Sequence, residues 1–330
     1  MEFNDLCNIL NLGKIVDGSN RIFGGLLHRM YAIKTKKGKY AIKALNPKIM
    51  LRSGAIQNFS NSEGIANIVS KSVAALPAKR FNEVFIHKVH NQFYLVFDWV
   101  DGKSLKSNEI NIKHCRKIGT ILADIHMADF SELEIVNDCV EREQIADWNY
   151  YLQMGKENDM VWTKLMIKTI DKLYEWSTQA KASSRLLETD MVISHRDLDP
   201  KNVMWSGEKP IIIDWEAAGY VNPMQELIET ALYWSKNEVD NIDKEKFLTF
   251  IDAYRNRYGT LKLNWKIVLL SGFLSKLGWL EYNLKRSLGI ESSDKEEQSM
   301  GTTQVIETIY DIIYYSKAIP KLEKWLGDAI

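Results

Sequence analysis

Alternating apolar and polar positions near the start of the chain predict a small antiparallel sheet. Residues 30–35 (Met-Tyr-Ala-Ile-Lys-Thr) and 39–45 (Lys-Tyr-Ala-Ile-Lys-Ala-Leu) repeat one pattern on either side of a Lys-Lys-Gly turn, which is typical of a β-hairpin. The apolar run 93–97 is typical of a buried strand, and apolar side chains recur at helical spacing over 62–76. We therefore expect a sheet with one helix in this part of the chain.

Helical spacing dominates the rest of the chain. From residue 112, apolar side chains recur every three or four positions on one face of a helix that should end near His126. A second helical pattern covers 223–234, an apolar strand begins at Ile211, and residues 291–298 form a polar loop. These patterns predict an α+β fold, with a sheet-rich segment over 1–98 and a mainly helical segment over 99–330.

The strongest chemical signal is a pair of motifs. Residues 195–202 read His-Arg-Asp-Leu-Asp-Pro-Lys-Asn, and the strand from Ile211 leads into Asp214. Mg²⁺ prefers oxygen ligands, usually one or two carboxylates with phosphate and water, and Asp214 and Asn202 can supply protein oxygens. Asp197 is then free to accept the proton of an incoming hydroxyl. A turn in which carboxylates cap backbone N–H groups is the alternative, but it explains one Asp and not the ordered set.

The spacing H-x-D-x-x-x-x-N, followed by a strand that leads into Ile213-Asp-Trp-Glu216, resembles the aminoglycoside phosphotransferase and choline kinase family. The resemblance implies a bilobal protein-kinase-like fold, with residues 1–98 as the N-lobe and 99–330 as the C-lobe. It implies ATP (or GTP) and Mg²⁺ as cofactors, and His195 as a residue that braces the catalytic loop. An ordinary protein kinase is disfavoured because Trp-Glu, not Phe-Gly, follows Asp214 and no A-P-E sequence closes an activation segment.

A nucleotide site is expected around the hairpin. Lys43 lies on its second strand, where a kinase carries the lysine that touches the α- and β-phosphates and pairs with a helix Glu. Glu63 is the only acidic residue between Gly18 and Asn82, so it is the local candidate, although in a first helical turn it would instead serve the helix dipole. A surface-strand lysine is the alternative for Lys43.

Two further parts of the nucleotide site are expected from position. Gly24 and Gly25, just before the hairpin, would let the backbone approach phosphates closely because glycine has no Cβ. The family resemblance implies that the strand over 93–97 leads into an interlobe hinge, in which the backbone of Asp98 and Val100 binds adenine. A simple strand end and turn is the alternative.

Charge is unevenly distributed, although the net charge is zero. Residues 1–100 carry 14 Lys and Arg against six Asp and Glu, and residues 101–330 carry 29 against 37. This polarity suits a basic lobe over triphosphate and an acidic lobe that receives a cationic acceptor, although solvated surfaces are an equally simple explanation. Nucleic-acid binding is not expected, because the basic residues alternate with strand-core positions and the pI is about 7.0.

The acceptor region is expected in an acidic run over 124–147 and in the carboxy-terminal helices, where the resembled family binds its acceptors. Carboxylates and aromatic rings there could bind the ammonium groups of an aminoglycoside or enclose a quaternary ammonium. The candidates are Asp147, Trp148, Asp199, Glu216, Trp279, Glu281 and Tyr282.

We interpret the sequence as an ATP-dependent phosphotransferase that moves a γ-phosphate to a hydroxyl of a small, cationic, aminoglycoside-like acceptor. A choline or ethanolamine kinase is an alternative, because residues 213–223 are similar to the choline-kinase form of the motif. A nucleotide-binding scaffold without chemistry is another. The chain shows no signal-peptide pattern, no apolar stretch near the roughly 20 residues that span a bilayer, and no C-x-x-C spacing. We therefore expect a cytoplasmic enzyme without a membrane partner.

Overall fold

The computed structural model describes residues 3–22, 27–135, 145–237, 241–261, 264–292 and 294–329. The chain forms two compact units. Unit 1 contains residues 1–110, 124–136 and 193–219, and unit 2 contains residues 111–123, 137–192 and 220–330. The lobe boundary expected at residue 98 remains a prediction, and these units group the chain differently because residues 193–219 belong with the amino-terminal segment.

Unit 1 is built on a five-stranded antiparallel sheet with the strand order β1-β2-β3-β5-β4. Its strands are β1 (Asn20–Ile22), β2 (Arg29–Lys34), β3 (Lys39–Ala44), β4 (His87–Val89) and β5 (Gln92–Asp98). A second, three-stranded sheet contains β6 (Lys103–Ser104), β8 (Val203–Ser206) and β9 (Lys209–Ile212). The predicted hairpin is confirmed, with Tyr31 opposite Ile42 in its register.

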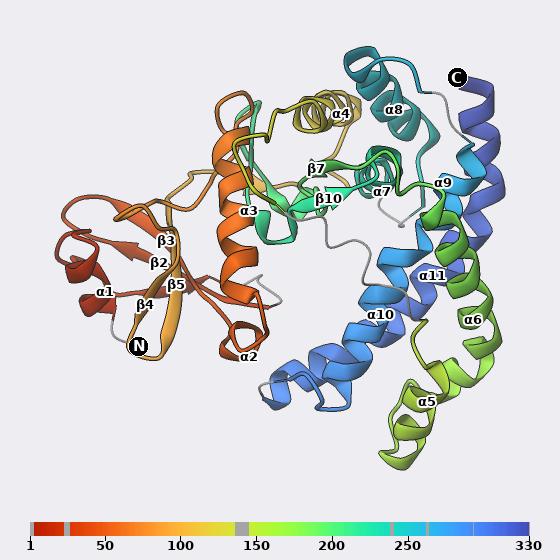
Figure 1. Ribbon diagram of the computed structural model, residues 1–330, viewed down its shortest axis with the longest axis horizontal. Helices are drawn as coiled ribbons and strands as arrows, with labels where there is room; N and C mark the ends of the chain where they lie inside the picture. Colours follow the sequence, from red (N-terminus) through yellow and green to blue (C-terminus); the bar gives the residue numbers. More distant parts are fainter. Residues whose placement is uncertain are drawn as a thin grey trace. The chain divides into compact units, whose positions relative to one another are not determined.

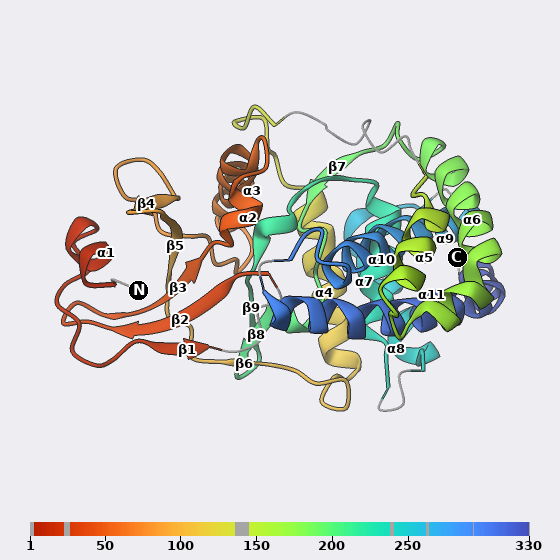
Figure 2. The same ribbon diagram turned by 90° about the horizontal axis from the view of Figure 1, so that it is seen from below.

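Helices cover both faces of the larger sheet (Figures 1 and 2). Side chains of α1 (Phe3–Ile9) pack on one face, with Ile42 and Val96. The neighbouring residues Leu95 and Phe97 point to the other face, where Phe59 of α3 (Ala55–Val69) packs beside α2 (Pro47–Met50). Because successive strand residues alternate between faces, this packing fixes the direction of every side chain on β3 and β5.

The helix predicted over 62–76 is displaced in the structure. α3 begins at Ala55, after Gly54 with φ of 76°, and ends at Val69. Its buried stripe includes Ala55 and Phe59, which extend the helical spacing two turns toward the amino terminus. Glu63 therefore lies in the middle of α3, where it cannot serve the dipole of the first turn.

Unit 2 is mainly helical. Its helices are α5 (Trp148–Glu157), α6 (Thr163–Arg185), α7 (Pro223–Trp234), α8 (Lys244–Tyr258), α9 (Trp265–Ser271), α10 (Phe273–Ser287) and α11 (Lys295–Ala329), and it includes the first part of α4 (Ile112–His126). α10 packs along α11, and α6 packs against α9 and α10 (Figure 1). α10 and α11 approach closely at Gly301, where a Cβ would lie 2.8 Å from the backbone nitrogen of Ser287.

The helices expected over 112–126 and 223–234 are confirmed, whereas the polar loop is shorter than expected because α11 already begins at Lys295. Two of the boundaries between the units fall within β7 (Val192–Ser194) and β10 (Gly219–Val221). The predicted α+β class, with an amino-terminal antiparallel sheet and a mainly helical remainder, is confirmed. Among the described residues, no helix has the length and apolar character needed to cross a bilayer.

Candidate active site

Lys43 is a buried cation held by two carboxylates. It lies between Ile42 and Ala44, whose side chains face α1, so its own side chain points to the opposite face of the sheet. Its Nζ donates to Asp214 Oδ1 at 2.5 Å and to Glu216 Oε2 at 2.9 Å. Burial by itself would lower the pKa of this lysine, but the two carboxylates raise it above its ordinary value, so the group stays charged.

The predicted ion pair between Lys43 and Glu63 is not made. Glu63 Oε2 instead accepts the backbone N–H of Ala78 at 2.6 Å. Its side chain is almost completely buried, and this desolvation raises its pKa to about 7, against the opposing effects of the Ala78 hydrogen bond and of Lys43. Glu216 takes the place beside Lys43 because it follows Asp214 in the same short turn, η3 (Trp215–Ala217).

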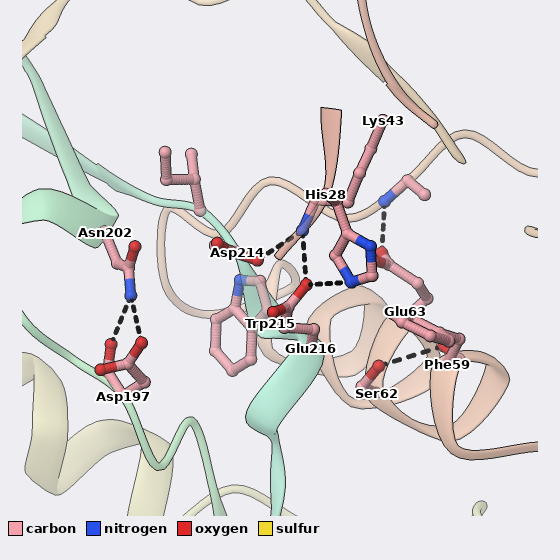
Figure 3. Close-up of polar contacts among 12 residues, drawn as sticks. His28, Lys43, Phe59, Ser62, Glu63, Asp197, Asn202, Asp214, Trp215 and Glu216 are labelled. Carbon is pink, nitrogen blue, oxygen red and sulfur yellow. Dashed lines mark hydrogen bonds and ion pairs between the residues drawn. The ribbon is translucent and has the colours of Figure 1, made fainter. Parts of the chain in front are cut away.

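A histidine completes this cluster (Figure 3). His28 Nδ1 accepts the backbone N–H of Asn46 at 2.9 Å, so its proton lies on Nε2, which faces Glu216 Oε2 at 3.3 Å. Burial favours the neutral form of Glu216, but Lys43 and His28 outweigh it and hold the pKa of this carboxyl well below its usual range. The sequence showed no pattern that pointed to this role for His28.

The motif over residues 195–202 forms a second cluster in the same unit. Asn202 Nδ2 donates to both the backbone oxygen and Oδ2 of Asp197, each at 2.8 Å (Figure 3). Both amide hydrogens of Asn202 are therefore used on Asp197, and its amide oxygen is left for another partner. Burial raises the pKa of Asp197 to about 7, although 38% of its side chain remains exposed.

His195 joins the two motif loops. Its Nδ1 accepts the backbone N–H of Asp197 at 3.2 Å, and its Nε2 donates to the backbone oxygen of Ile213 at 3.0 Å. The backbone N–H of Ile213 in turn donates to the backbone oxygen of Asn202 at 2.9 Å. The ring of His195 also packs edge-on against Trp215, 4.6 Å between centroids. These contacts are those expected of a residue that braces the loop.

Backbone pairing brings Asp214 to Lys43. Ile212, the last residue of β9, exchanges two backbone hydrogen bonds of 2.8 Å with Ala74 and Leu76, which follow α3. Asp214 then adopts a left-handed conformation with φ of 62°, which is uncommon for a residue with a side chain. The turn thereby directs Asp214 and Glu216 to the same ammonium group.

The oxygen set of this unit fits a magnesium ion. Asn202 offers an amide oxygen, and Asp214 has a second carboxylate oxygen beyond the one on Lys43. Among the described residues, no group of three or more His, Cys, Asp and Glu is arranged to hold a metal. Mg²⁺ does not need such a cage, because it keeps several waters and takes its other ligands from substrate phosphates.

The expected hinge follows β5. The Asp98 carboxylate forms an exposed ion pair with Lys79 at 2.7 Å, so only its backbone is available for a base. The backbone N–H of Trp99 donates to the backbone oxygen of Lys39 at 3.2 Å. The backbone N–H of Val100 has no acceptor among the described residues. This pattern suits adenine recognition by the backbone. Gly24 and Gly25 lie outside the described residues.

The candidate acceptor residues have different environments. Trp148 is almost fully buried and donates its indole N–H to Ser177 at 3.0 Å, so it is a core residue and the predicted contact with an acceptor is not supported. Asp147 caps α5 by accepting the Tyr150 N–H at 3.1 Å, and Asp199 caps the short turn η2 (Pro200–Asn202). Each capping carboxylate therefore has a structural partner.

The candidates on α10 lie on a half-buried face. Trp279 and Tyr282 stack with their ring centroids 5.5 Å apart. Glu281 Oε1 accepts the hydroxyl of Tyr151 at 2.9 Å and lies 3.1 Å from Lys285 Nζ. The aromatic pair stays a candidate, whereas the charge of Glu281 is already paired. Three of the eight carboxylates of the acidic run, Asp138, Glu141 and Glu143, lie outside the described residues.

Unit 2 also contains a pocket that the sequence did not indicate. Its walls come from α7, α9, α10 and α11, and its residues include Glu229, Tyr233, Lys276, Asp311 and Tyr315. Both hydrogen bonds to Glu229, from Tyr233 at 3.1 Å and Ser275 at 2.7 Å, end on Oε1, which leaves Oε2 open to a further donor. Burial raises the pKa of Glu229 above its usual value, and the Lys276 ammonium is paired with Asp311 at 2.7 Å.

Comparison with solved structures identifies similar folds. A choline kinase from Cryptosporidium parvum Iowa II aligns with a TM-score of 0.59 and 12% identity, over 98% of this chain and 99% of that one. An ethanolamine kinase from Plasmodium vivax aligns with a TM-score of 0.58 and 19% identity, over 88% and 81%. A spectinomycin phosphotransferase in complex with ADP and spectinomycin aligns with a TM-score of 0.66 and 11% identity, over 95% and 98%.

No curated protein matches the chain by sequence. The sequence model of the phosphotransferase enzyme family, however, matches residues 21–261. This range includes Lys43, both motif loops and their connecting contacts. The chain belongs to the phosphotransferase enzyme family.

Proposed function

We propose that this protein transfers the γ-phosphate of a magnesium-bound nucleoside triphosphate, ATP in the first instance, to a hydroxyl of a small cationic molecule. The observation that carries the proposal is the grouping of its chemistry within unit 1. Asp197 lies against Asn202, Asp214 lies against Lys43, and His195 connects the two loops. A fold that held only a nucleotide would have no need for a carboxylate beside the metal-binding amide.

Each side chain then has one task. Lys43 binds the α- and β-phosphates, and Glu216 with His28 keeps it charged and directed. Asn202 and Asp214 would hold the metal, which would neutralise phosphate charge. Asp197 orients the acceptor hydroxyl and takes its proton, a role favoured by a pKa of about 7, near the working pH of a general base. His195 holds the catalytic loop against the metal loop.

Positioning accounts for most of the expected rate enhancement. In phosphoryl transfer the protein does little covalent chemistry and acts mainly by alignment and by stabilising charge. The backbone hydrogen bond from Ile213 to Asn202 joins the two loops that carry Asp197 and Asp214, so it helps to fix the positions of their carboxylates. Adenine would bind to the backbone of Asp98 and Val100, and the phosphates would meet Gly24 and Gly25, as their place in the sequence predicts.

We propose that the acceptor carries an ammonium group and that unit 2 recognises it. The pocket beside Glu229 supports this assignment, because it combines one open carboxylate oxygen with tyrosine rings, which suits a cation. Its volume of about 40 Å³ holds roughly three waters, so an ammonium head group fits and a whole aminoglycoside ring does not. Trp279 and Tyr282 are a second candidate surface.

Two acceptor classes remain in view. Aminoglycosides present several ammonium groups, whereas choline and ethanolamine present one, and proteins similar in structure to this one act on each class by name. The small pocket beside Glu229 favours an acceptor with one ammonium group. The acidic charge of residues 101–330 favours a polycation.

A panel assay tests the proposal. ATP consumption would be measured against aminoglycosides, macrolides, choline, ethanolamine, homoserine and sugars, with the Asp197→Ala variant beside the wild-type protein. We expect one class to stimulate ATP consumption in the wild type and not in the variant. Tight MgATP binding without stimulation by any acceptor would favour the scaffold alternative, and absence of nucleotide binding would refute both.

A further inference from the structure

Lys201 is a cation in the catalytic loop for which the roles above provide no task. It lies four residues after Asp197 and directly before Asn202. Its Nζ is 3.6 Å from Asp197 Oδ2, the same oxygen that accepts a hydrogen bond from Asn202. Burial lowers the pKa of Lys201, but Asp197, Asp199 and Asp214 together raise it above its usual value. Lys201 therefore lies among the carboxylates that surround the reaction.

The local turn fixes the backbone of Lys201 but not its side chain. Asp199 Oδ1 accepts the backbone N–H of Lys201 at 2.8 Å, and Pro200 opens the short 3₁₀ turn that leads to Asn202. The contact with Asp197 is longer than the 2.7–2.9 Å or so of a charge-assisted hydrogen bond, and 55% of the Lys201 side chain is exposed. The ammonium group therefore lies near Asp197 without a short hydrogen bond to it.

Lys43 and Lys201 differ in this respect. Lys43 is buried and donates two short hydrogen bonds, whereas Lys201 has a single long contact on the side of the acceptor base. A lysine that served only to neutralise the loop would gain most from a short, direct bond to a carboxylate. A long, flexible stem with a loosely held charge suits a group that must follow a moving ligand.

We propose that Lys201 is a catalytic residue whose ammonium group contacts the phosphoryl group while it is transferred. The proposal rests on the proposed function. In that reaction the bond between the γ-phosphorus and its bridging oxygen breaks, and a bond from the acceptor oxygen to phosphorus forms. The hydroxyl proton passes to Asp197, and the nucleoside diphosphate leaves with the bridging electrons. Lys201 keeps its protons throughout and stabilises the charge on the phosphoryl oxygens.

Distances support this placement. The acceptor hydroxyl must lie within about 3 Å of Asp197 to lose its proton, and the phosphorus that it attacks lies about 3–3.5 Å from that hydroxyl. An ammonium group 3.6 Å from the Asp197 carboxylate can therefore reach a phosphoryl oxygen by rotation of its own stem. Charge gathers on these oxygens in the transition state, so a positive group there acts on the chemical step more than on binding.

Three variants test the inference. Lys201→Met removes the charge and keeps much of the length, Lys201→Arg keeps the charge, and Lys209→Met is a matched control at an exposed position of β9 in the same unit. Two measurements avoid the need for a known acceptor. One is the slow hydrolysis of MgATP, in which water replaces the hydroxyl. The other is the affinity for MgADP with and without fluoroaluminate, a planar stand-in for the phosphoryl group in transfer.

For Lys201→Met we expect MgADP affinity within about twofold of wild type and ATP hydrolysis lower by about 10²-fold, the usual effect of removing one donor from a developing oxyanion. The gain in affinity from fluoroaluminate should be lost in the same variant, restored at least in part in Lys201→Arg, and unchanged in Lys209→Met. Retained MgADP binding shows that the variant is folded.

Two results would overturn the inference in distinguishable ways. If Lys201→Met hydrolyses ATP and gains affinity from fluoroaluminate like the wild type, Lys201 does not contact the transferring group and the proposed function still stands. If the wild type neither binds MgADP nor hydrolyses MgATP, the proposed function fails and this inference fails with it. If Lys201→Met does not fold, the same two measurements on Lys201→Arg and Lys201→Gln decide between contact and no contact.

Discussion

Glu63 provides the sharpest physical test, because two arrangements of this buried carboxyl give opposite pH dependences. In the structure Glu63 accepts the Ala78 N–H, and burial raises its pKa from 4.5 to about 7. A group whose pKa is raised on folding contributes no penalty below its unfolded pKa, because both states are protonated there. As the pH rises, the carboxyl ionises first in the unfolded chain. The free energy of unfolding therefore falls progressively until the pH passes the folded pKa.

The perturbation is Glu63→Gln, which keeps the shape and the acceptor for Ala78 but cannot ionise. A carboxyl whose pKa moves from 4.5 to about 7 loses about 3 kcal/mol once fully ionised. The unfolding free energy of the wild type, relative to the variant, should therefore fall by about 2–3 kcal/mol between pH 5 and pH 8. The variant should be the more tolerant protein at alkaline pH.

Urea unfolding at a series of pH values measures this difference. Glu132→Gln is the matched control, because Glu132 is 73% exposed and lies 3.4 Å from Lys71 on the surface of the same unit. Its difference from the wild type should stay flat across the range. If Glu63→Gln instead weakens the protein most at alkaline pH, the carboxylate is ionised and paired with Lys43, and the environment derived for Glu63 is wrong.

The remaining predictions concern turnover, metal and acceptor. Asp197→Ala should retain MgATP binding, because the proposed metal ligands are other residues, and its turnover should fall by about 10²–10⁴-fold. A near-wild-type rate with the correct acceptor would exclude this role for Asp197. Asp214→Asn should reduce the Mg²⁺ enhancement of nucleotide affinity in titrations with and without the metal, and an unchanged enhancement would show that Asp214 is no ligand. Glu229→Gln should raise KM for a cationic acceptor while changing kcat less; an unaltered KM would exclude the pocket. KM for that acceptor should also rise with salt, more than for a neutral analogue, because attraction is screened over about 8–10 Å at physiological ionic strength, and indifference to salt would argue against a charged acceptor.

The sequence by itself determined the elements whose signals are local. The hairpin at 29–44, the helices at 112–126 and 223–234, and the α+β class follow from the spacing of apolar residues, because each element buries a face that its own residues define. The contact between Asp197 and Asn202 could also be predicted from the sequence, because the two residues are close in the chain and their turn brings them into hydrogen-bond contact. Family membership was predicted from these residues and is confirmed over residues 21–261.

Tertiary structure decided which carboxylate meets Lys43. Glu63 was the only acidic residue near it in sequence, but Glu216, 173 residues away, forms the ion pair. The reason is long-range backbone pairing, which brings the end of β9 beside the residues that follow α3, and no local pattern encodes that contact. The start of α3 was misjudged for a related reason, because the packing of Ala55 and Phe59 in the core extends the helix beyond its clearest apolar stripe.

The environments of single side chains were also beyond the sequence. Trp148 and Trp279 were equivalent as aromatic candidates, yet one is buried with its N–H bonded and the other stacks on a half-buried face. The pocket beside Glu229 draws residues from four helices, so it exists only once those helices pack. A sequence specifies which groups are available for chemistry, whereas burial, pairing and pKa depend on neighbours that only the folded chain brings together.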